Sequence, residues 1–268
     1  MIIGYDLTEW EMYRQRIPVE SQLRKLPHLL LTGKSGSGKS QSFLWYAYHI
    51  LKDDESLLFL ADFKQGQEYK GLVGSLSYAY ADDAVTMIQE YYKLYTLMRK
   101  SESSHTSIPH VTLVIEEWFG LLGYIESQDK KLKTELMSKV GEILALGRGI
   151  GNGFGIFLMV QRADSSNFSA GSREQFQNIV SYGRLSKEQK AMLFTDSEIF
   201  NDGIRNYKPG QGVALIDGQG DAVEIIVPWV PEQDRLLQKI REYMDNQPSI
   251  QELIQQTEAT EGVAEQKP

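Results

Sequence analysis

A short segment near the amino end combines glycines, a lysine and hydroxyl side chains in a spacing that suits phosphate chemistry. Residues 33–40 read Gly-Lys-Ser-Gly-Ser-Gly-Lys-Ser and fit the pattern G-x-x-x-x-G-K-[ST] in full. Glycines and small serines let successive backbone N–H groups converge on a phosphate chain, and a following helix adds its partial positive charge. The residues predicted to bind ATP are Gly33, Lys34, Ser35, Gly36, Ser37, Gly38, Lys39, Ser40 and Gln41.

Two side chains of this loop have separate expected roles. The Lys39 ammonium group would reach the β- and γ-phosphates and so take part in catalysis, and the Ser40 hydroxyl would bind Mg²⁺. An apolar run at 28–32 leads into the loop, and a stretch with helical spacing at 41–51 leads out of it. The alternative is a glycine-rich turn capped by Ser40, but the order of strand, loop and helix argues against it.

A pair of carboxylates follows another apolar run. Residues 111–115 are Val-Thr-Leu-Val-Ile and lead directly into Glu116 and Glu117, which is the layout of a Walker B element. A carboxylate at the carboxyl end of a strand can serve Mg²⁺, and its neighbour can polarise an attacking water. We therefore expect Glu116 to serve the metal through its water shell and Glu117 to be the catalytic base. The alternative is two exposed acids at the start of a loop, and Asp is more usual at the metal position.

The elements that must position these groups alternate along the chain. Continuous apolar runs, typical of strands buried on both faces of a sheet, lie at 28–32, 57–61, 111–115, 155–160 and 179–182. Helical spacing marks 40–52, 82–100, 129–147, 187–194 and 231–245. This order predicts an α/β fold of the P-loop NTPase (RecA-like) type, with a mainly parallel sheet flanked by helices. Two late runs, 212–216 and 222–227, flank Asp-Gly-Gln-Gly-Asp and predict an antiparallel hairpin.

Composition limits the class of protein. The chain has 268 residues, of which 41% are hydrophobic, so it can bury a core of one large domain. It has no Cys, which excludes disulfides, thiolate zinc sites and a cysteine nucleophile. A net charge of −8 speaks against an overall basic coat for nucleic acid, so any DNA contact must be a local patch.

The chain divides into two predicted parts. Residues 1–246 carry the motifs and the alternating elements, and we expect them to form one ATPase motor domain. Residues 247–268 hold four Glu against one Lys and few large apolar residues, so we expect an acidic, disordered tail.

Several motifs follow one another in the order and spacing of one family of ATPases. They are Leu-Pro-His-Leu-Leu at 26–30 before the phosphate loop, Asp-Phe-Lys at 62–64, Ile-Glu-Glu-Trp at 115–118, Gln-Arg at 161–162 and Gly-Gln-Gly at 210–212. Together they resemble the motor domain of FtsK/SpoIIIE-type DNA translocases, in the HerA/FtsK superfamily of P-loop ATPases. The segments 161–164 and 185–189 look most like the coupling proteins of Gram-positive conjugative elements. The resemblance covers about residues 1–245.

This resemblance implies an ATPase ring, usually a hexamer, that moves DNA through its central pore. By position, Gln161 matches the family's γ-phosphate sensor, and its amide can hydrogen-bond both phosphate and water. Arg148 resembles the position from which the family inserts an arginine into a neighbouring subunit's site, although its surroundings are about two residues longer here. Arg162 and Arg184 are weaker candidates for that task, and an ordinary surface or ion-paired arginine is the alternative for each.

Contacts with DNA would come from a few basic side chains multiplied around the ring, because a motor holds the phosphate backbone without reading bases. The candidates are Arg14, Arg16, Arg24, Lys25, Lys130, Lys131, Lys133, Lys187 and Lys190. Ordinary solvated helix faces are the alternative. The small, polar segment 165–173 is a candidate pore loop. The expected DNA partner is double-stranded and bound without sequence preference.

The sequence also predicts where in the cell the protein is located. No apolar run approaches 18 residues, and Met1 is not followed by a basic region with an apolar core. The motor-like sequence begins almost at Met1, and only the acidic tail follows about residue 245. We therefore expect a cytoplasmic motor without its own anchor or DNA reader, recruited to a membrane or a complex by partner proteins.

Three functions remain open at this level. The first is an ATP-driven DNA translocase acting in conjugative or plasmid DNA transfer. The second keeps the motor and changes the cargo, because the same family includes the ATPase domains of type VII protein-secretion machines. The third is a nucleotide-dependent assembly module with little turnover, in which Glu116 in place of Asp weakens hydrolysis. A metabolic kinase is disfavoured, because no lid or acceptor-substrate motif is visible.

Overall fold

A single ten-stranded sheet runs through the computed structural model, which describes residues 1–52, 56–101, 108–164, 168, 171–195, 197–199 and 206–264. The strand order is β2-β1-β10-β9-β8-β3-β7-β6-β4-β5. The strands are β1 Ile2–Asp6, β2 Pro18–Glu20, β3 Leu29–Gly33, β4 Ser56–Asp62, β5 Tyr78–Tyr80, β6 His110–Glu116, β7 Phe154–Val160, β8 Asn178–Tyr182, β9 Gln211–Ile216 and β10 Val223–Ile226.

The sheet has a parallel part and an antiparallel part. Strands β8, β3, β7, β6, β4 and β5 pair in parallel, whereas β9, β10, β1 and β2 continue the sheet with antiparallel pairs. Every residue of β3, β4, β6 and β7 is buried, which explains their continuous apolar runs. The predicted α/β fold with a late hairpin is therefore confirmed, and two amino-terminal strands extend its antiparallel edge beyond the prediction.

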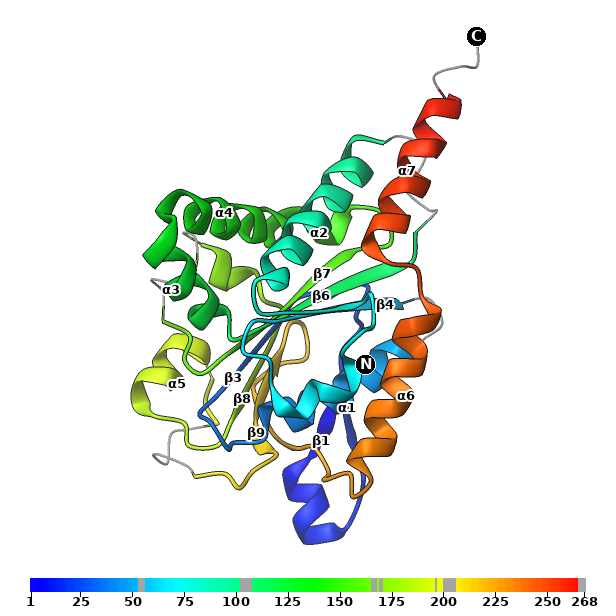
Figure 1. Cartoon of the computed structure of the whole chain (residues 1–268). Helices are drawn as coiled ribbons and strands as arrows, with labels where there is room; N and C mark the ends of the chain where they lie inside the picture. Colours follow the sequence, from blue (N-terminus) through cyan, green and yellow to red (C-terminus); the bar gives the residue numbers. More distant parts are fainter. Residues whose placement is uncertain are drawn as a thin grey trace.

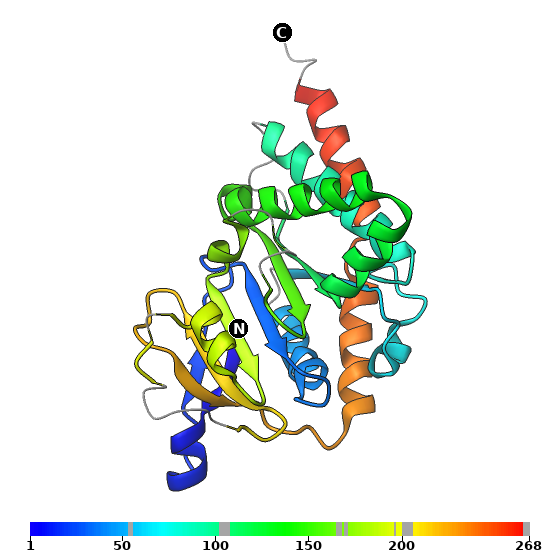
Figure 2. The ribbon, with the colours of Figure 1, turned by 90° about the vertical axis from the view of Figure 1, so that its left-hand side faces the viewer.

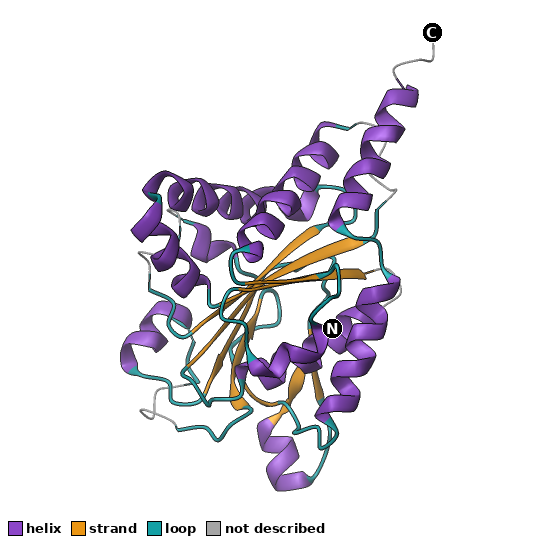
Figure 3. Cartoon of the chain, viewed as in Figure 1, coloured by secondary structure: helices purple, strands orange, loops and turns teal. Residues whose placement is uncertain are grey.

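Helices cover both faces of the sheet (Figures 1 and 3). They are α1 Lys39–Lys52, α2 Asp83–Lys100, α3 Trp118–Gln128, α4 Lys130–Leu146, α5 Lys187–Leu193, α6 Gln233–Asn246 and α7 Ile250–Ala264. One apolar layer joins the sheet to α2, α3, α4, α5 and α7, and the other joins it to α1 and α6. Figure 2 shows the π-helix Glu9–Tyr13 projecting beyond the antiparallel edge.

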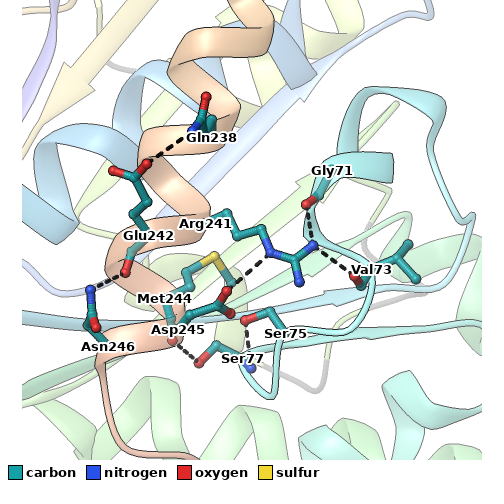
Figure 4. A network of polar contacts seen from close by, with 10 residues as sticks. All are labelled: Gly71, Val73, Ser75, Ser77, Gln238, Arg241, Glu242, Met244, Asp245 and Asn246. Carbon is teal, nitrogen blue, oxygen red and sulfur yellow. Dashed lines mark hydrogen bonds and ion pairs between the residues drawn. The ribbon is translucent and has the colours of Figure 1, made fainter.

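Helix α6 is fixed to the short 3-10 helix η2 (Gln67–Leu72) and the turn after it (Figure 4). The Arg241 guanidinium donates to the carbonyls of Gly71 at 2.7 Å and Val73 at 2.9 Å, and it pairs with Asp245 at 3.1 Å. The Ser77 hydroxyl donates to the Met244 carbonyl at 3.2 Å. These contacts join η2 and the residues after it to α6, and Tyr69 of η2 lies close enough to Glu116, at the end of β6, to lower its pKa.

The expectation of a disordered acidic tail is wrong for residues 250–264, and residues 265–268 of that tail lie outside the described residues. Residues 250–264 form α7, which packs along α2 and buries Ile250, Leu253 and Ile254. Ser249 and Glu252 cap this helix reciprocally, with the Ser249 amide donating to the Glu252 carboxylate at 2.8 Å. The three apolar side chains recur at helical spacing, so a short segment with few apolar residues can dock on a neighbouring helix.

Part of the candidate pore loop at 165–173 lies outside the described residues, namely 165–167 and 169–170. Its end is described: residues 172–175 form a 3-10 turn, and the Arg173 guanidinium donates to the Ala163 carbonyl at 3.3 Å.

Candidate functional site

The phosphate-binding loop joins the buried strand β3 to helix α1 and packs against the turn before β9. Gly38 has φ +98°, and a Cβ there would lie 2.6 Å from the Gly210 amide nitrogen, so only glycine fits. The Gly210 amide also donates to the Ser37 carbonyl at 3.0 Å. The loop is thus supported by a segment about 170 residues later in the chain, the same Gly-rich turn that carries part of the family resemblance.

Lys39 begins α1 and folds back over the loop. Its ammonium group donates to the carbonyls of Gly33 and Lys34, and its side chain is buried. Burial is the main cause that lowers the pKa of Lys39, whereas the carboxylates of Glu117 and Glu116 act in the opposite direction. A cation held between the loop and two carboxylates is positioned to neutralise phosphate oxygens.

Glu116 lies at the end of β6 and is 3% exposed. Its Oε1 accepts a hydrogen bond from the Ser40 hydroxyl at 3.3 Å, and its Oε2 is buried without a hydrogen-bond partner among the described residues. Burial is the main cause that raises its pKa to about 7, with Asp62 and Glu68 acting in the same sense.

These oxygens fit the requirements of Mg²⁺. A hard divalent cation prefers carboxylate, hydroxyl and phosphate oxygens, and a buried carboxylate with an unpaired oxygen beside Ser40 offers such donors. No group of three or more His, Cys, Asp or Glu in the described part of the chain can hold a metal by itself. Ser40 and Glu116 would therefore hold the ion together with nucleotide phosphates and water.

A polar shell surrounds Glu116 from the β4 side. Asp62 is the register partner of Glu116 on β4, and it accepts hydrogen bonds from the Gly66 amide at 2.7 Å and the Tyr78 hydroxyl at 2.9 Å. The Tyr69 hydroxyl, buried on η2, lowers the pKa of Glu116. These polar groups surround the end of β6 that carries the Glu116 carboxylate.

Glu117 occupies a different environment from its neighbour. It precedes α3, is half-buried, and has φ +52° and ψ +42°, the left-handed region that is unfavourable for a residue with a Cβ. Its Oε1 accepts a hydrogen bond from the Gln161 amide at 3.3 Å, and Gln161 directly follows β7. The left-handed backbone conformation therefore directs the Glu117 carboxylate toward Gln161, which follows the neighbouring strand β7.

A cavity of about 340 Å³ collects these groups. Its walls include Lys34, Ser35, Gly36, Gly38, Lys39, Ser40, Gln41, Glu116, Glu117 and Gln161. Gly33 and Ser37 belong to the loop but do not line the cavity, and a Cβ on Gly33 would meet the Ser37 hydroxyl at 2.5 Å. Apart from Arg148, the predicted site residues are thus brought together at the carboxyl ends of β3, β6 and β7.

The cavity also contains residues that were not predicted to belong to it. Lys64 and Glu68 come from the segment after β4, and Pro209 and Trp229 come from the segments flanking β9 and β10. The Asp-Phe-Lys motif was a signal for Lys64. Nothing local in the sequence marks Trp229, because only the sheet order brings the end of β10 next to the loop.

Arg148 is not part of this cavity. It is exposed in the 3-10 turn before β7, whereas Gln161 follows the other end of that seven-residue strand. A strand of this length spans about 20 Å. Arg148 therefore lies at the opposite edge of the sheet from its own phosphate loop. Of the weaker candidates, Arg162 pairs with Asp164 at 3.5 Å, and Arg184 is exposed just after β8.

No protein-family model matches the chain. Among curated proteins, it is similar to the FtsK domain-containing protein YdcQ of Bacillus subtilis (strain 168), with 25% identity over 228 residues. That alignment covers 79% of this chain and 45% of YdcQ, so the chain spans about half the length of this relative.

Solved structures share the fold. The cytoplasmic domain of the Thermomonospora curvata type VII secretion ATPase EccC matches with a TM-score of 0.66 and 17% identity, over 94% of this chain and 32% of that one. The pCW3 conjugation coupling protein TcpA, in its monomer form with ATPγS, matches with a TM-score of 0.61 and 18% identity, over 90% of this chain and 69% of that one.

The helices of the described residues include none long and apolar enough to cross a membrane. Four observations point to the same kind of site, one that binds a nucleotide. They are the phosphate loop, the acidic strand end with Gln161 beside it, the sheet order and the similarity to YdcQ. The chain carries a complete phosphate-binding loop on an α/β sheet and is similar in sequence to an FtsK domain-containing protein.

Proposed function

We propose that this domain hydrolyses ATP to move double-stranded DNA in conjugative or plasmid DNA transfer. The observation that carries the hydrolytic part is the 3.3 Å contact between Gln161 and Glu117 beside the phosphate loop. The cargo is suggested by the likeness to TcpA, a conjugation coupling protein, over 90% of this chain.

In the proposed reaction each side chain has one task. Glu117 accepts a proton from the attacking water, and Gln161 orients that water and senses the γ-phosphate. Lys39 neutralises charge on the β- and γ-phosphates. Mg²⁺, held through Ser40 and Glu116, would neutralise the charge that develops on the phosphate oxygens.

Arg148 enters the proposal as a residue that serves a second subunit. Because it lies across the sheet from its own phosphate loop, it can complete a site only in another copy of the chain, as in a ring such as a hexamer. An arginine finger contributes about 10³–10⁵ in rate. Arg148→Ala should abolish hydrolysis and leave nucleotide binding intact. Mixing it with Glu117→Gln subunits should restore activity; no activity at any ratio would contradict a finger that acts between subunits.

The DNA-contacting side chains remain candidates. Lys130 and Lys131 are exposed at the start of α4, whereas Lys133 pairs with Glu126 at 2.7 Å. Arg14 and Arg16 belong to the projecting amino-terminal segment, where Arg16 lies over the Trp10 ring. Arg24 and Lys25 precede β3, and Lys187 and Lys190 are on α5. These positions are spread over several elements, so repetition around a ring would be needed to form a continuous basic track.

The deciding experiment is ATP hydrolysis at low salt with and without linear double-stranded DNA, with Lys39→Ala as the control. A DNA motor should show stimulation by DNA that is lost in Lys39→Ala. Lys131→Ala also removes a lysine charge, but from α4 and outside the nucleotide site. If α4 contacts DNA, this variant should keep its basal hydrolysis and show weaker stimulation by DNA. Hydrolysis indifferent to DNA would contradict a DNA cargo.

A protein cargo is the second candidate. Several structural neighbours are type VII secretion ATPases, and one was solved as T. curvata EccC (ATPases 2 and 3) in complex with a signal sequence peptide. Hydrolysis that responds to a secretion-signal peptide and ignores DNA would favour this function. In both cases we propose a cytoplasmic location, with partner proteins that recruit the motor to a membrane or complex.

The third candidate is a nucleotide-dependent assembly module with little turnover. It would bind ATP and change its oligomeric state without measurable hydrolysis. Detectable hydrolysis that disappears in Glu117→Gln would eliminate it.

A further inference from the structure

Trp229 is an exposed aromatic residue that lines the nucleotide cavity. It follows β10, is 68% exposed, and makes no ring or cation–π contact among the described residues. Pro228 and Pro231 flank it closely and restrict the backbone on either side. A large apolar ring held by a stiff segment at the mouth of a cavity loses little conformational freedom when it binds a flat ligand.

The sheet order gives the cavity two chemically different ends. Strands β7, β6 and β4 lie on one side of β3, and the lining residues that follow them, Gln161, Glu116, Glu117, Lys64 and Glu68, are polar or charged. Strands β9 and β10 lie on the other side, and the lining residues Pro209 and Trp229 beside them carry no charge. The charged end contains the proposed catalytic base, so the γ-phosphate must lie there.

The orientation of the phosphates then places the rest of the nucleotide. Lys39 serves the β- and γ-phosphates, and the backbone at the start of α1 serves the α- and β-phosphates. Gln41 lies one residue beyond Ser40 along α1, so the α-phosphate side of the nucleotide faces the uncharged end. The sugar and base therefore leave the loop toward Pro209 and Trp229.

A hydrogen bond fixes one of the uncharged side chains. The Gln41 amide donates to the Gln233 side-chain carbonyl oxygen at 2.7 Å, and Gln233 begins α6, four residues after Trp229. Gln41 lines the cavity and Gln233 does not, so this contact holds the Gln41 side chain at the cavity wall. The uncharged end thus offers an aromatic face beside a fixed amide side chain.

We propose that Trp229 stacks on the base of the bound nucleotide and, through the larger ring area, favours purines over pyrimidines. This inference rests on the proposed function as a nucleotide-hydrolysing motor. Stacking tolerates any base because every base has a π-face, so the indole ring would not separate adenine from guanine. Trp229 is a binding residue here and takes no part in the chemical step.

The test compares a nucleotide with a phosphate chain that has no base. Calorimetry with the full chain would measure the dissociation constants of the ATP analogue AMP-PNP and of inorganic tripolyphosphate, both with Mg²⁺. Trp229→Ala should weaken AMP-PNP binding on the order of tenfold and leave tripolyphosphate binding unchanged. Trp229→Phe should lie between wild type and Trp229→Ala. Tyr13→Ala, which removes another exposed aromatic ring away from the cavity, should change neither.

Fluorescence gives an independent readout of the same contact. AMP-PNP should quench the indole emission of wild type, and this quenching should be lost in Trp229→Phe. Unchanged AMP-PNP affinity in Trp229→Ala, or equal weakening of AMP-PNP and tripolyphosphate, would overturn the stacking role. Failure of the nucleotide site itself has a different signature, because Lys39→Ala would then leave the affinities for both ligands unchanged.

Discussion

The two sides of the acidic strand end differ sharply although their carboxylates are adjacent in the chain. On the buried side, Glu116 is closed in by Ser40, Tyr69 and Asp62, and its pKa is raised to about 7. On the open side, Glu117 is half-buried, sits in a left-handed backbone turn, and contacts the exposed Gln161.

This difference teaches how one residue type can take two tasks. A carboxylate in a closed polar shell suits a fixed cation, because the shell holds its oxygens in place. A carboxylate at an accessible edge suits proton transfer from water, which must enter and leave. Environment, more than residue type, separates such roles in paired carboxylates. The three predictions below test this separation, starting with the largest expected effect.

Glu117→Gln should remove the catalytic base and leave the surroundings of Glu116 unchanged. The amide keeps the size of the side chain and removes the base, so kcat should fall about 10²–10⁴-fold while AMP-PNP binding stays near wild type. Steady-state hydrolysis and calorimetry together measure this split. Glu135→Gln, at an exposed acid on α4 that pairs with Lys139, should leave kcat unchanged. Equal losses in both variants would show that Glu117 has no special role.

Glu116→Gln should show how much stability the protein loses by burying an ionised carboxylate. The pKa of Glu116 is near 7 in the folded chain and about 4.5 when unfolded, so the folded state holds its proton more tightly between these values. Stability is therefore lost as pH rises from about 4.5 to 7, by at most about 3 kcal/mol. The variant, neutral throughout, should match wild type near pH 4 and exceed it at pH 8.

Urea unfolding of the nucleotide-free chain at several pH values measures this difference. The same variant should need more Mg²⁺ to bind AMP-PNP, which would separate a stabilising effect from a functional one. A constant stability difference across pH would mean that Glu116 is charged and solvated in the folded chain.

Tyr69→Phe should have the smallest of the three effects, and it should change the Mg²⁺ requirement assigned to Glu116 without changing the kcat assigned to Glu117. The Tyr69 hydroxyl lowers the pKa of Glu116, so its removal should keep more of this carboxyl protonated, and the Mg²⁺ concentration needed for tight AMP-PNP binding should rise about fivefold. The kcat at saturating Mg²⁺ should hardly change, because Glu117 is untouched. Tyr91→Phe is the matched control: it removes a buried tyrosine hydroxyl that donates to the Val111 and Gly155 carbonyls, far from the loop. An unchanged Mg²⁺ requirement in Tyr69→Phe would separate Tyr69 from the metal side.

Local sequence predicted most of the fold, because strands buried on both faces leave continuous apolar runs and the helices between them keep a regular period. It failed for the segment after Gln247, where Ile250, Leu253 and Ile254 are too few to predict a helix without the α2 surface on which they pack. The strand Ile2–Asp6 was also missed, since its place at the antiparallel edge depends on pairing with β10, more than 200 residues later.

For the site, the sequence by itself determined the phosphate loop and the acidic strand end, because each is a continuous segment whose residue types suffice for its chemistry. The tertiary structure decided what depends on the sheet order. The parallel pairing of β3 and β7 placed Arg148 across the sheet from the loop, and the strand order closed a polar shell around Glu116 and brought Trp229 to the cavity. Spacing along a chain reports neighbours within one helix or strand, whereas distances between strands are set only when the whole sheet has formed.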